Sequence, residues 1–214
     1  MQKTRLLLWF AAATAIAVFG ALYFVERMGP EPPGEAERAR TAEEIAREIV
    51  TGEFSLIDKR GRPVADTDFR GSWLLIFFGY THCPDVCPTT LGTVALVMDA
   101  LGADSGALQP LFITVDPARD TPDVVGAYVA AFHPKIIGLT GTEEQVAAAA
   151  KSHRAYFAVV PVPSGTGSDA EDYAMDHSAH LYLMDPDGVY ATVYSQADTV
   201  ETIARNIRER MTRK

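Results

Sequence analysis

The chain has 214 residues, enough for one globular domain with appendages. Hydrophobic residues make up 48% of it and charged residues 22%, a balance that suits a packed core and excludes a disordered chain. A net charge of -9 excludes the basic surface that nucleic-acid binding needs, so we expect no nucleic-acid partner.

An uncharged apolar segment at 6–25 follows Lys3 and Arg5 near the N-terminus. As a helix it would span roughly 30 Å, the thickness of a bilayer's hydrocarbon core. A cleaved signal peptide is the alternative, but its apolar region usually has only about 7–15 residues. We therefore expect an uncleaved, single-pass anchor with its basic end inside and its body exported. Because no long Arg- and Ser-rich transit segment precedes it, the sequence favours a bacterial inner membrane, with the soluble domain in the periplasm.

Three parts are expected along the chain. They are an anchor at 1–28, a linker with a short helix at 29–51, and a folded domain at 52–214. Three prolines stiffen and extend the start of the linker. A capping box that begins at Thr41 predicts the short helix.

Apolar runs alternate with segments of helical periodicity in the folded part. Buried strands are predicted at 73–78 and 111–115, further strands at 136–139 and 156–160, and helices at 91–101, 122–132, 143–152 and 199–211. Turn residues predict a short hairpin at 53–63, a flexible loop at 161–172, and a closing hairpin at 179–194. This alternation indicates an α/β fold, with a central, largely parallel sheet to which the hairpin adds antiparallel strands.

The only two cysteines, Cys83 and Cys87, lie between the first buried strand and the helix that follows it. Pro88 predicts a helix start with Cys87 as the N-cap, and Pro84 would equally place Cys83 there. In either case one sulfur lies at the positive end of a helix, so we expect a lowered thiol pKa. Residues four apart on a helix share a face, so the pair could form a disulfide, exchange with another disulfide, or bind a soft metal ion.

The spacing and number of the thiols bear on the choice between a structural disulfide and a metal site. A structural disulfide suits an oxidising compartment, but a bridge across so short a loop would constrain little chain entropy. Two thiolates suit Cu(I), and two thiolates with one imidazole suit copper in either oxidation state. Structural zinc normally needs four ligands, whereas catalytic zinc with an open position stays compatible with the ligand count.

Five histidines compete to be a third ligand. His82 adjoins Cys83 but is expected to point away, and His133 and His153 suit surface or packing positions. His177 and His180 are three apart at the start of a strand, so at most one of them faces the site. Spacing alone leaves His177 undecided between a ligand and a surface histidine.

Three motifs taken together resemble those of the Sco/SenC family of copper-binding assembly proteins. They are the two-cysteine segment 79–88, the Asp-Pro segment 114–122, and Asp176-His177-Ser178 with the turn 185–188. The likeness runs from about residue 52 to the end of the chain. It implies a thioredoxin-like fold and a copper ion, Cu(I) or Cu(II), bound by Cys83, Cys87 and His177. It also implies a role in assembling the binuclear copper (CuA) site on subunit II of cytochrome c oxidase.

Two functions are compatible with these features. The first is a membrane-anchored copper chaperone, not an enzyme, with a periplasmic copper donor and a thiol reductant as further partners. The second is a thiol–disulfide oxidoreductase, in which Cys83 would attack and Cys87 would resolve the mixed disulfide, so that both would be catalytic. A peroxidase on the same fold is disfavoured, because nothing indicates a single peroxide-tuned cysteine. The sequence neither supports nor excludes a copper or redox sensor.

Overall fold

The computed structural model describes residues 18–21, 23–24, 38, 44–161 and 173–213. The chain divides into two compact units, Met1–Thr41 and Ala42–Lys214. The predicted anchor at 6–25 lies largely outside the described residues, and the predicted three-part division stays a prediction.

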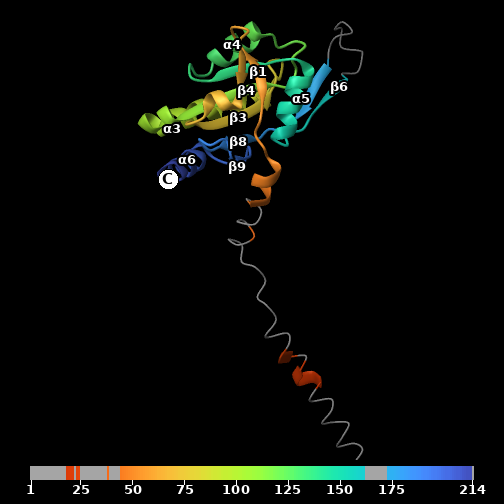
Figure 1. Cartoon of the computed structure of the whole chain (residues 1–214), viewed down its shortest axis with the longest axis vertical. Coiled ribbons are helices and arrows are strands. Elements are labelled where there is room, and N and C mark those ends of the chain that lie inside the picture. Colours follow the sequence, from red (N-terminus) through yellow and green to blue (C-terminus); the bar gives the residue numbers. More distant parts are fainter. Residues whose placement is uncertain (1–17, 22, 25–37, 39–43, 162–172, 214) are drawn as a thin grey trace, which may run out of the picture. The chain divides into compact units, whose positions relative to one another are not determined.

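A seven-stranded mixed sheet forms the centre of the second unit, in the order β2-β1-β5-β4-β3-β8-β9 (Figure 1). Its strands are β1 (Ser55–Asp58), β2 (Pro63–Ala65), β3 (Trp73–Gly79), β4 (Leu108–Thr114), β5 (Ile137–Thr140), β8 (Leu181–Met184) and β9 (Tyr190–Tyr194). The inner strands β5, β4 and β3 run parallel, and the pairings outside them are antiparallel. Every residue of β3 is buried, as its unbroken apolar run predicts for a central strand.

The remaining two strands form a second sheet, separate from the seven-stranded one. It pairs β6 (Phe157–Pro161) with β7 (Tyr173–His177) in antiparallel register, so that Phe157 is opposite His177. The helices are α3 (Val86–Leu101), α4 (Pro122–Ala130), α5 (Glu143–Ser152) and α6 (Val200–Thr212), with 3₁₀ turns η1 (Asp66–Phe69) and η2 (Gly102–Ala107). A further helical turn covers 44–49.

Helices cover both faces of the large sheet. Phe77 and Phe78 are neighbours on β3, so their rings point to opposite faces. On the Phe77 face, the ring of Phe112 packs between Phe77 and Tyr128 of α4, with centroids 6.0 and 5.7 Å away. The helices α3 and α6 lie side by side on this face (Figure 1). On the other face His153, which follows α5, packs on Phe78 with ring centroids 5.2 Å apart.

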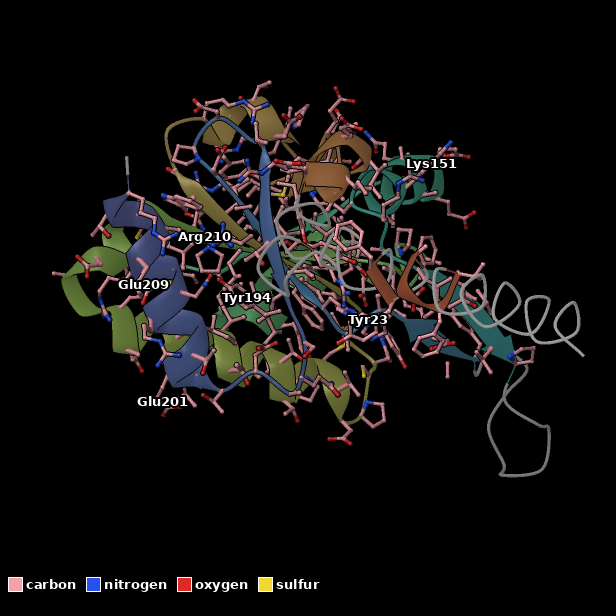
Figure 2. All side chains as sticks on the ribbon, turned by 90° about the horizontal axis from the view of Figure 1, so that it is seen from below. Tyr23, Lys151, Tyr194, Glu201, Glu209 and Arg210 are labelled. Atoms are coloured by element: carbon pink, nitrogen blue, oxygen red, sulfur yellow. The ribbon has the colours of Figure 1, made fainter. Side chains whose placement is uncertain are left out.

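The C-terminal helix α6 is amphipathic. Ile203 and Ile207 are buried, whereas Glu201 and Glu209 are exposed to solvent on the same helix (Figure 2). The hydroxyl of Tyr194 on β9 lies 2.7 Å from Asn206 Oδ1 and donates to it. This hydrogen bond and the buried apolar stripe dock α6 against the closing hairpin.

Two predicted features are corrected by the structure. The helix α3 begins at Val86 with Asp85 at the N-cap, so neither cysteine caps it. Pro88 lies in the first turn, where a proline is tolerated because its missing N–H would have no intrahelical partner. The strand β7 was not predicted, because the sequence favours a loop up to 172 and gives the next segment no clear alternation.

Within the described residues, Val86–Ala107 is a helical stretch long and apolar enough to cross a membrane by length and composition. Its apolar side chains Leu91, Val94 and Met98 are buried in the core of the unit. Burial of this kind is typical of the core helix of a globular domain.

Candidate metal centre

The two cysteines lie on either side of the start of α3, directly after β3. Cys83 is in the turn and is half-buried, whereas Cys87 is the second residue of the helix and is fully buried. The backbone N–H of Cys87 donates to Cys83 Sγ over 3.4 Å. Both are free thiols, and Cys83 is the more accessible of the two.

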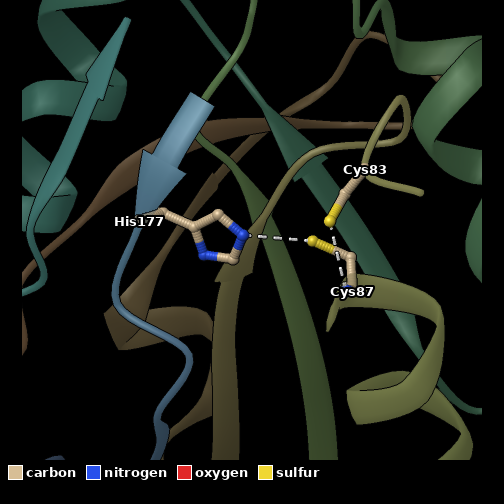
Figure 3. A group of neighbouring side chains, drawn as sticks. All are labelled: Cys83, Cys87 and His177. Carbon is tan, nitrogen blue, oxygen red and sulfur yellow. Dashed lines mark hydrogen bonds between the residues drawn. The ribbon is translucent and has the colours of Figure 1, made fainter. Parts of the chain in front are cut away.

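The third side chain of the cluster comes from a distant part of the chain. His177 ends β7, and its Nε2 lies 3.3 Å from Cys87 Sγ (Figure 3). Its Nδ1 lies 3.3 Å from the carbonyl oxygen of Ser178. A proton on Nδ1 would donate to that carbonyl and leave a lone pair on Nε2, directed at the thiols.

The donor atoms of Cys83, Cys87 and His177 all lie within 4.8 Å of one another. Two metal–ligand bonds of about 2.0–2.3 Å nearly cover that distance. The set contains two sulfurs and one imidazole nitrogen and no carboxylate, which fits a soft or borderline metal such as copper. The fold thus brings the three predicted ligands together.

The other histidines lie elsewhere. His82 shares the turn, but its Nδ1 is 3.2 Å from Thr81 Oγ1, and His153 is buried on the opposite face of the sheet. Among the described residues, the metal-binding cluster does not include any of these other histidines: His82, His133, His153 and His180.

Burial governs the electrostatics of the centre. It raises the pKa of the Cys87 thiol, with smaller contributions from Cys83 and Asp120. This is opposite to the predicted lowering, because the loss of solvation at a fully buried sulfur outweighs the favourable end of the helix. Burial also lowers the pKa of His177, which favours the neutral imidazole that a metal requires.

A buried carboxylate holds the cysteine-bearing turn in place. Asp120 is 0% exposed and lies in the loop between β4 and α4. One carboxylate oxygen accepts from the backbone N–H of Thr81 at 2.9 Å and from Thr114 Oγ1 at 2.6 Å, and the other accepts from Thr81 Oγ1 at 2.6 Å. These bonds satisfy carboxyl oxygens that would be costly to bury without partners. Asp120 belongs to the Asp-Pro segment 114–122, but no local pattern in the sequence indicates this role for its side chain.

Aromatic rings enclose the imidazole of His177. The Tyr80 ring meets it edge-on with centroids 5.8 Å apart, and the Phe77 ring does so at 6.0 Å. These edge-on contacts restrict the orientation of the imidazole.

The fold and the cluster define a thioredoxin-like α/β protein with a paired-thiol centre suited to a soft metal. The sequence model for SCO1/SenC matches residues 42–212 of the chain. A bovine relative, the mitochondrial SCO2 homolog of Bos taurus, is 40% identical over 211 residues, which is 98% of this chain and 76% of that protein. The chain therefore belongs to the SCO1/SenC family.

Solved structures of relatives agree with this assignment. Arabidopsis thaliana ScoI with copper bound matches with a TM-score of 0.70 and 36% identity, over 77% of this chain and 99% of that one. Bradyrhizobium japonicum ScoI with copper bound matches with a TM-score of 0.66 and 41% identity, over 75% and 98%. Both relatives hold copper.

The predicted bacterial location is contradicted by the curated relatives. The relatives from Bos taurus, Homo sapiens and Saccharomyces cerevisiae are described as mitochondrial. The bacterial location was predicted because no transit segment precedes the apolar run. The bovine relative is described as mitochondrial, and it extends beyond the part that this chain matches. A basic N-terminus, an apolar segment and two thiols occur in proteins of bacterial and of mitochondrial membranes alike. These features therefore do not distinguish the two locations.

Proposed function

We propose that this protein is a copper chaperone anchored to a membrane by the segment 6–25, and that Cys83, Cys87 and His177 hold the ion. The observation that carries the proposal is the convergence of three donor atoms within 4.8 Å from segments far apart in the chain. Membership of a family with copper-bound members supports it further.

Copper is the cargo in this proposal. Because metal ligands must be deprotonated, loading copper releases the proton of the buried Cys87 thiol. The Ser178 carbonyl orients the imidazole, and the half-buried Cys83 gives an acceptor protein access to the ion. The acceptor we propose is subunit II of cytochrome c oxidase at its CuA site, with a copper donor and a thiol reductant acting upstream.

An anaerobic Cu(I) titration of the reduced full chain in detergent tests this function. X-ray absorption would count the sulfur and nitrogen ligands. We expect one copper per chain, with two sulfurs and one nitrogen. Cys83→Ser or Cys87→Ser should abolish tight binding, and near-wild-type affinity in either variant would refute the proposal.

A second function is favoured by the unequal exposure of the two thiols. Cys83 Sγ can attack a target disulfide to form a mixed disulfide, releasing one target thiolate. Cys87 then displaces the second target sulfur, and the pair ends as a Cys83–Cys87 disulfide that an external thiol reductant must reduce. The raised pKa of Cys87 disfavours this resolving step.

His177→Ala separates the two functions. The variant should lose copper affinity and its nitrogen ligand, yet keep the rate at which it reduces a model disulfide. If disulfide reduction falls in parallel with copper affinity, the imidazole serves both processes and the two functions are not independent.

A further inference from the structure

The strand that carries His177 is not a strand of the large sheet. Within the described residues, β7 pairs only with β6 and has no ladder with the seven-stranded sheet. Cys83 lies in the turn between β3 and α3, and Cys87 lies in α3, which packs on the large sheet. Backbone pairing therefore does not set the distance between the imidazole and the sulfurs, and side chains must do so.

Arg119 makes the side-chain contacts that span this gap. Its Nε donates to Asp116 in its own loop, and its Nη1 donates to the backbone oxygen of Tyr173, at the start of β7, over 3.0 Å. The Tyr173 hydroxyl donates to Asp116 Oδ1 over 2.6 Å. These three residues form a closed set of contacts, here termed the β7 clamp (Asp116, Arg119 and Tyr173).

The β7 clamp continues toward the metal cluster through aromatic contacts. The guanidinium carbon of Arg119 lies 3.7 Å from the centroid of the Tyr173 ring and 5.9 Å from that of Tyr80. The Tyr80 ring in turn meets His177 edge-on. Arg119 thus lies between the start of β7 and the ring that supports the imidazole, with its planar group stacked on a tyrosine.

We propose that Arg119 is a positioning residue for His177 and sets the imidazole at bonding distance from the thiols. Its chain neighbour Asp120 holds the cysteine-bearing turn through Thr81. Arg119 and Asp120, which are adjacent in one loop, therefore fix the position of His177 relative to the cysteine-bearing turn. This inference rests on the proposed copper function.

A double-mutant cycle tests the role of Arg119. Arg119→Met keeps the apolar stem and removes the guanidinium. We expect it to lower Cu(I) affinity about 10-fold, as is typical when a group that orients a ligand is lost, and to weaken the nitrogen signal in X-ray absorption. In a His177→Ala background the same substitution should change affinity less than 2-fold, because the ligand it positions is already gone. Equal losses in both backgrounds would overturn the proposal.

Arg62→Met is the matched control. Arg62 also pairs with an aspartate near in sequence, Asp58, at 2.6 Å, but it lies in the β1–β2 turn outside the cluster. We expect its copper affinity to equal that of the wild type. A loss as large as that of Arg119→Met would show that removing any such ion pair weakens the centre, and would refute a specific role for Arg119.

A metal-free measurement separates this inference from the copper function. In the apo protein, Arg119→Met should speed amide hydrogen exchange in β7 at least 10-fold, while exchange in β3 stays unchanged. If the wild type binds no copper but this selective effect appears, the proposed function fails and the positioning role of Arg119 stands. Unchanged exchange in β7 would overturn the positioning role, whatever the copper affinity.

Discussion

Burial separates two thiols that the sequence presents as equivalent. Cys87 is 0% exposed and its pKa is raised, whereas Cys83 is half-buried in the turn. A reagent must reach a sulfur and meet it as a thiolate before it can react. The two cysteines should therefore differ sharply in reactivity in the metal-free, reduced protein.

We expect iodoacetamide to modify Cys83 at least 10-fold faster than Cys87 at pH 8. Mass spectrometry of Cys83→Ser and Cys87→Ser, each with one remaining thiol, would give the two rates. In denaturant the rates should converge, because burial no longer distinguishes the sulfurs. Equal rates in the native protein would contradict the buried position of Cys87.

His153 is a titratable group buried far from the metal cluster. Its ring packs on Phe78 and Tyr182, and its Nδ1 donates to the carbonyl oxygen of Ala149 at 2.8 Å. Burial lowers its pKa from 6.5 to about 4, so the folded protein holds a neutral imidazole down to that pH. The unfolded chain takes up the proton already near pH 6.5.

Stability should therefore fall as the pH drops from 6.5 toward 4, because the unfolded state binds more protons there. The shift of His153 corresponds to about 3 kcal/mol at the acid end, at about 1.4 kcal/mol per pH unit. His153→Phe keeps a ring of similar shape and removes the titration. Urea unfolding at pH 7.5 and pH 5 should show a loss about 2 kcal/mol smaller in the variant than in the wild type. An equal loss in both would rule out His153 as the titrating group.

At the scale of elements, the contact between β3 and α3 shapes the thiol centre. Gly79 ends β3, and a Cβ there would lie 2.8 Å from Cys87 Sγ and 2.9 Å from the Phe112 ring. A strand residue with any side chain would therefore push the sulfur out of place. The glycine is needed for close approach, since its backbone is not in the left-handed region.

Gly79→Ala should destabilise the fold by about 1–3 kcal/mol through overpacking and also weaken copper binding. Gly92→Ala is the matched control, because Gly92 lies within α3 and a Cβ there meets nothing within 4 Å. That substitution should stabilise the helix by about 0.5–1 kcal/mol and leave copper binding unchanged. Chemical unfolding and copper titration of both variants would check this, and similar behaviour of the two would contradict a steric role at Gly79.

Local sequence patterns predicted most helices and strands, because apolar runs and the helical spacing of apolar residues can be recognised within a short stretch of sequence. The unbroken apolar run predicted β3, and the helix predicted at 143–152 coincides with α5. The start of α3 was misplaced because a proline fits any position of a first turn, so Pro88 alone did not fix the boundary. The strand β7 was missed because, within the residues that the structure describes, it pairs with β6, which lies on the other side of the segment 162–172. Pairing between strands separated in this way leaves no local signal in the sequence.

At the scale of the whole molecule, the candidate centre is a product of tertiary structure. Spacing could place Cys83 and Cys87 on one face of a helix, but 90 residues separate Cys87 from His177. Spacing alone left His177 undecided, and the family resemblance singled it out. The roles of Arg119 and Asp120 could not be predicted, because each depends on contacts with segments far away in the sequence.

Copper that bridges β7 and α3 would join two segments with no backbone pairing between them, and so should stabilise the whole folded unit. A ligand that binds only the folded state adds about 2.7 kcal/mol when its free concentration is 100 times the dissociation constant. We expect anaerobic Cu(I) to raise the unfolding temperature of the wild type by several degrees. The gain should be below the full value, because unfolded thiols also bind copper.

Variants of the three ligands make this measurement specific. Cys87→Ser should show no copper-dependent rise in unfolding temperature, and His177→Ala should show a smaller rise than the wild type, because two sulfurs can still hold the ion. His180→Ala is the control, since His180 lies outside the cluster and should behave as the wild type does. A full rise in Cys87→Ser would mean that copper stabilises the fold from another site, and would contradict a centre built from β7 and α3.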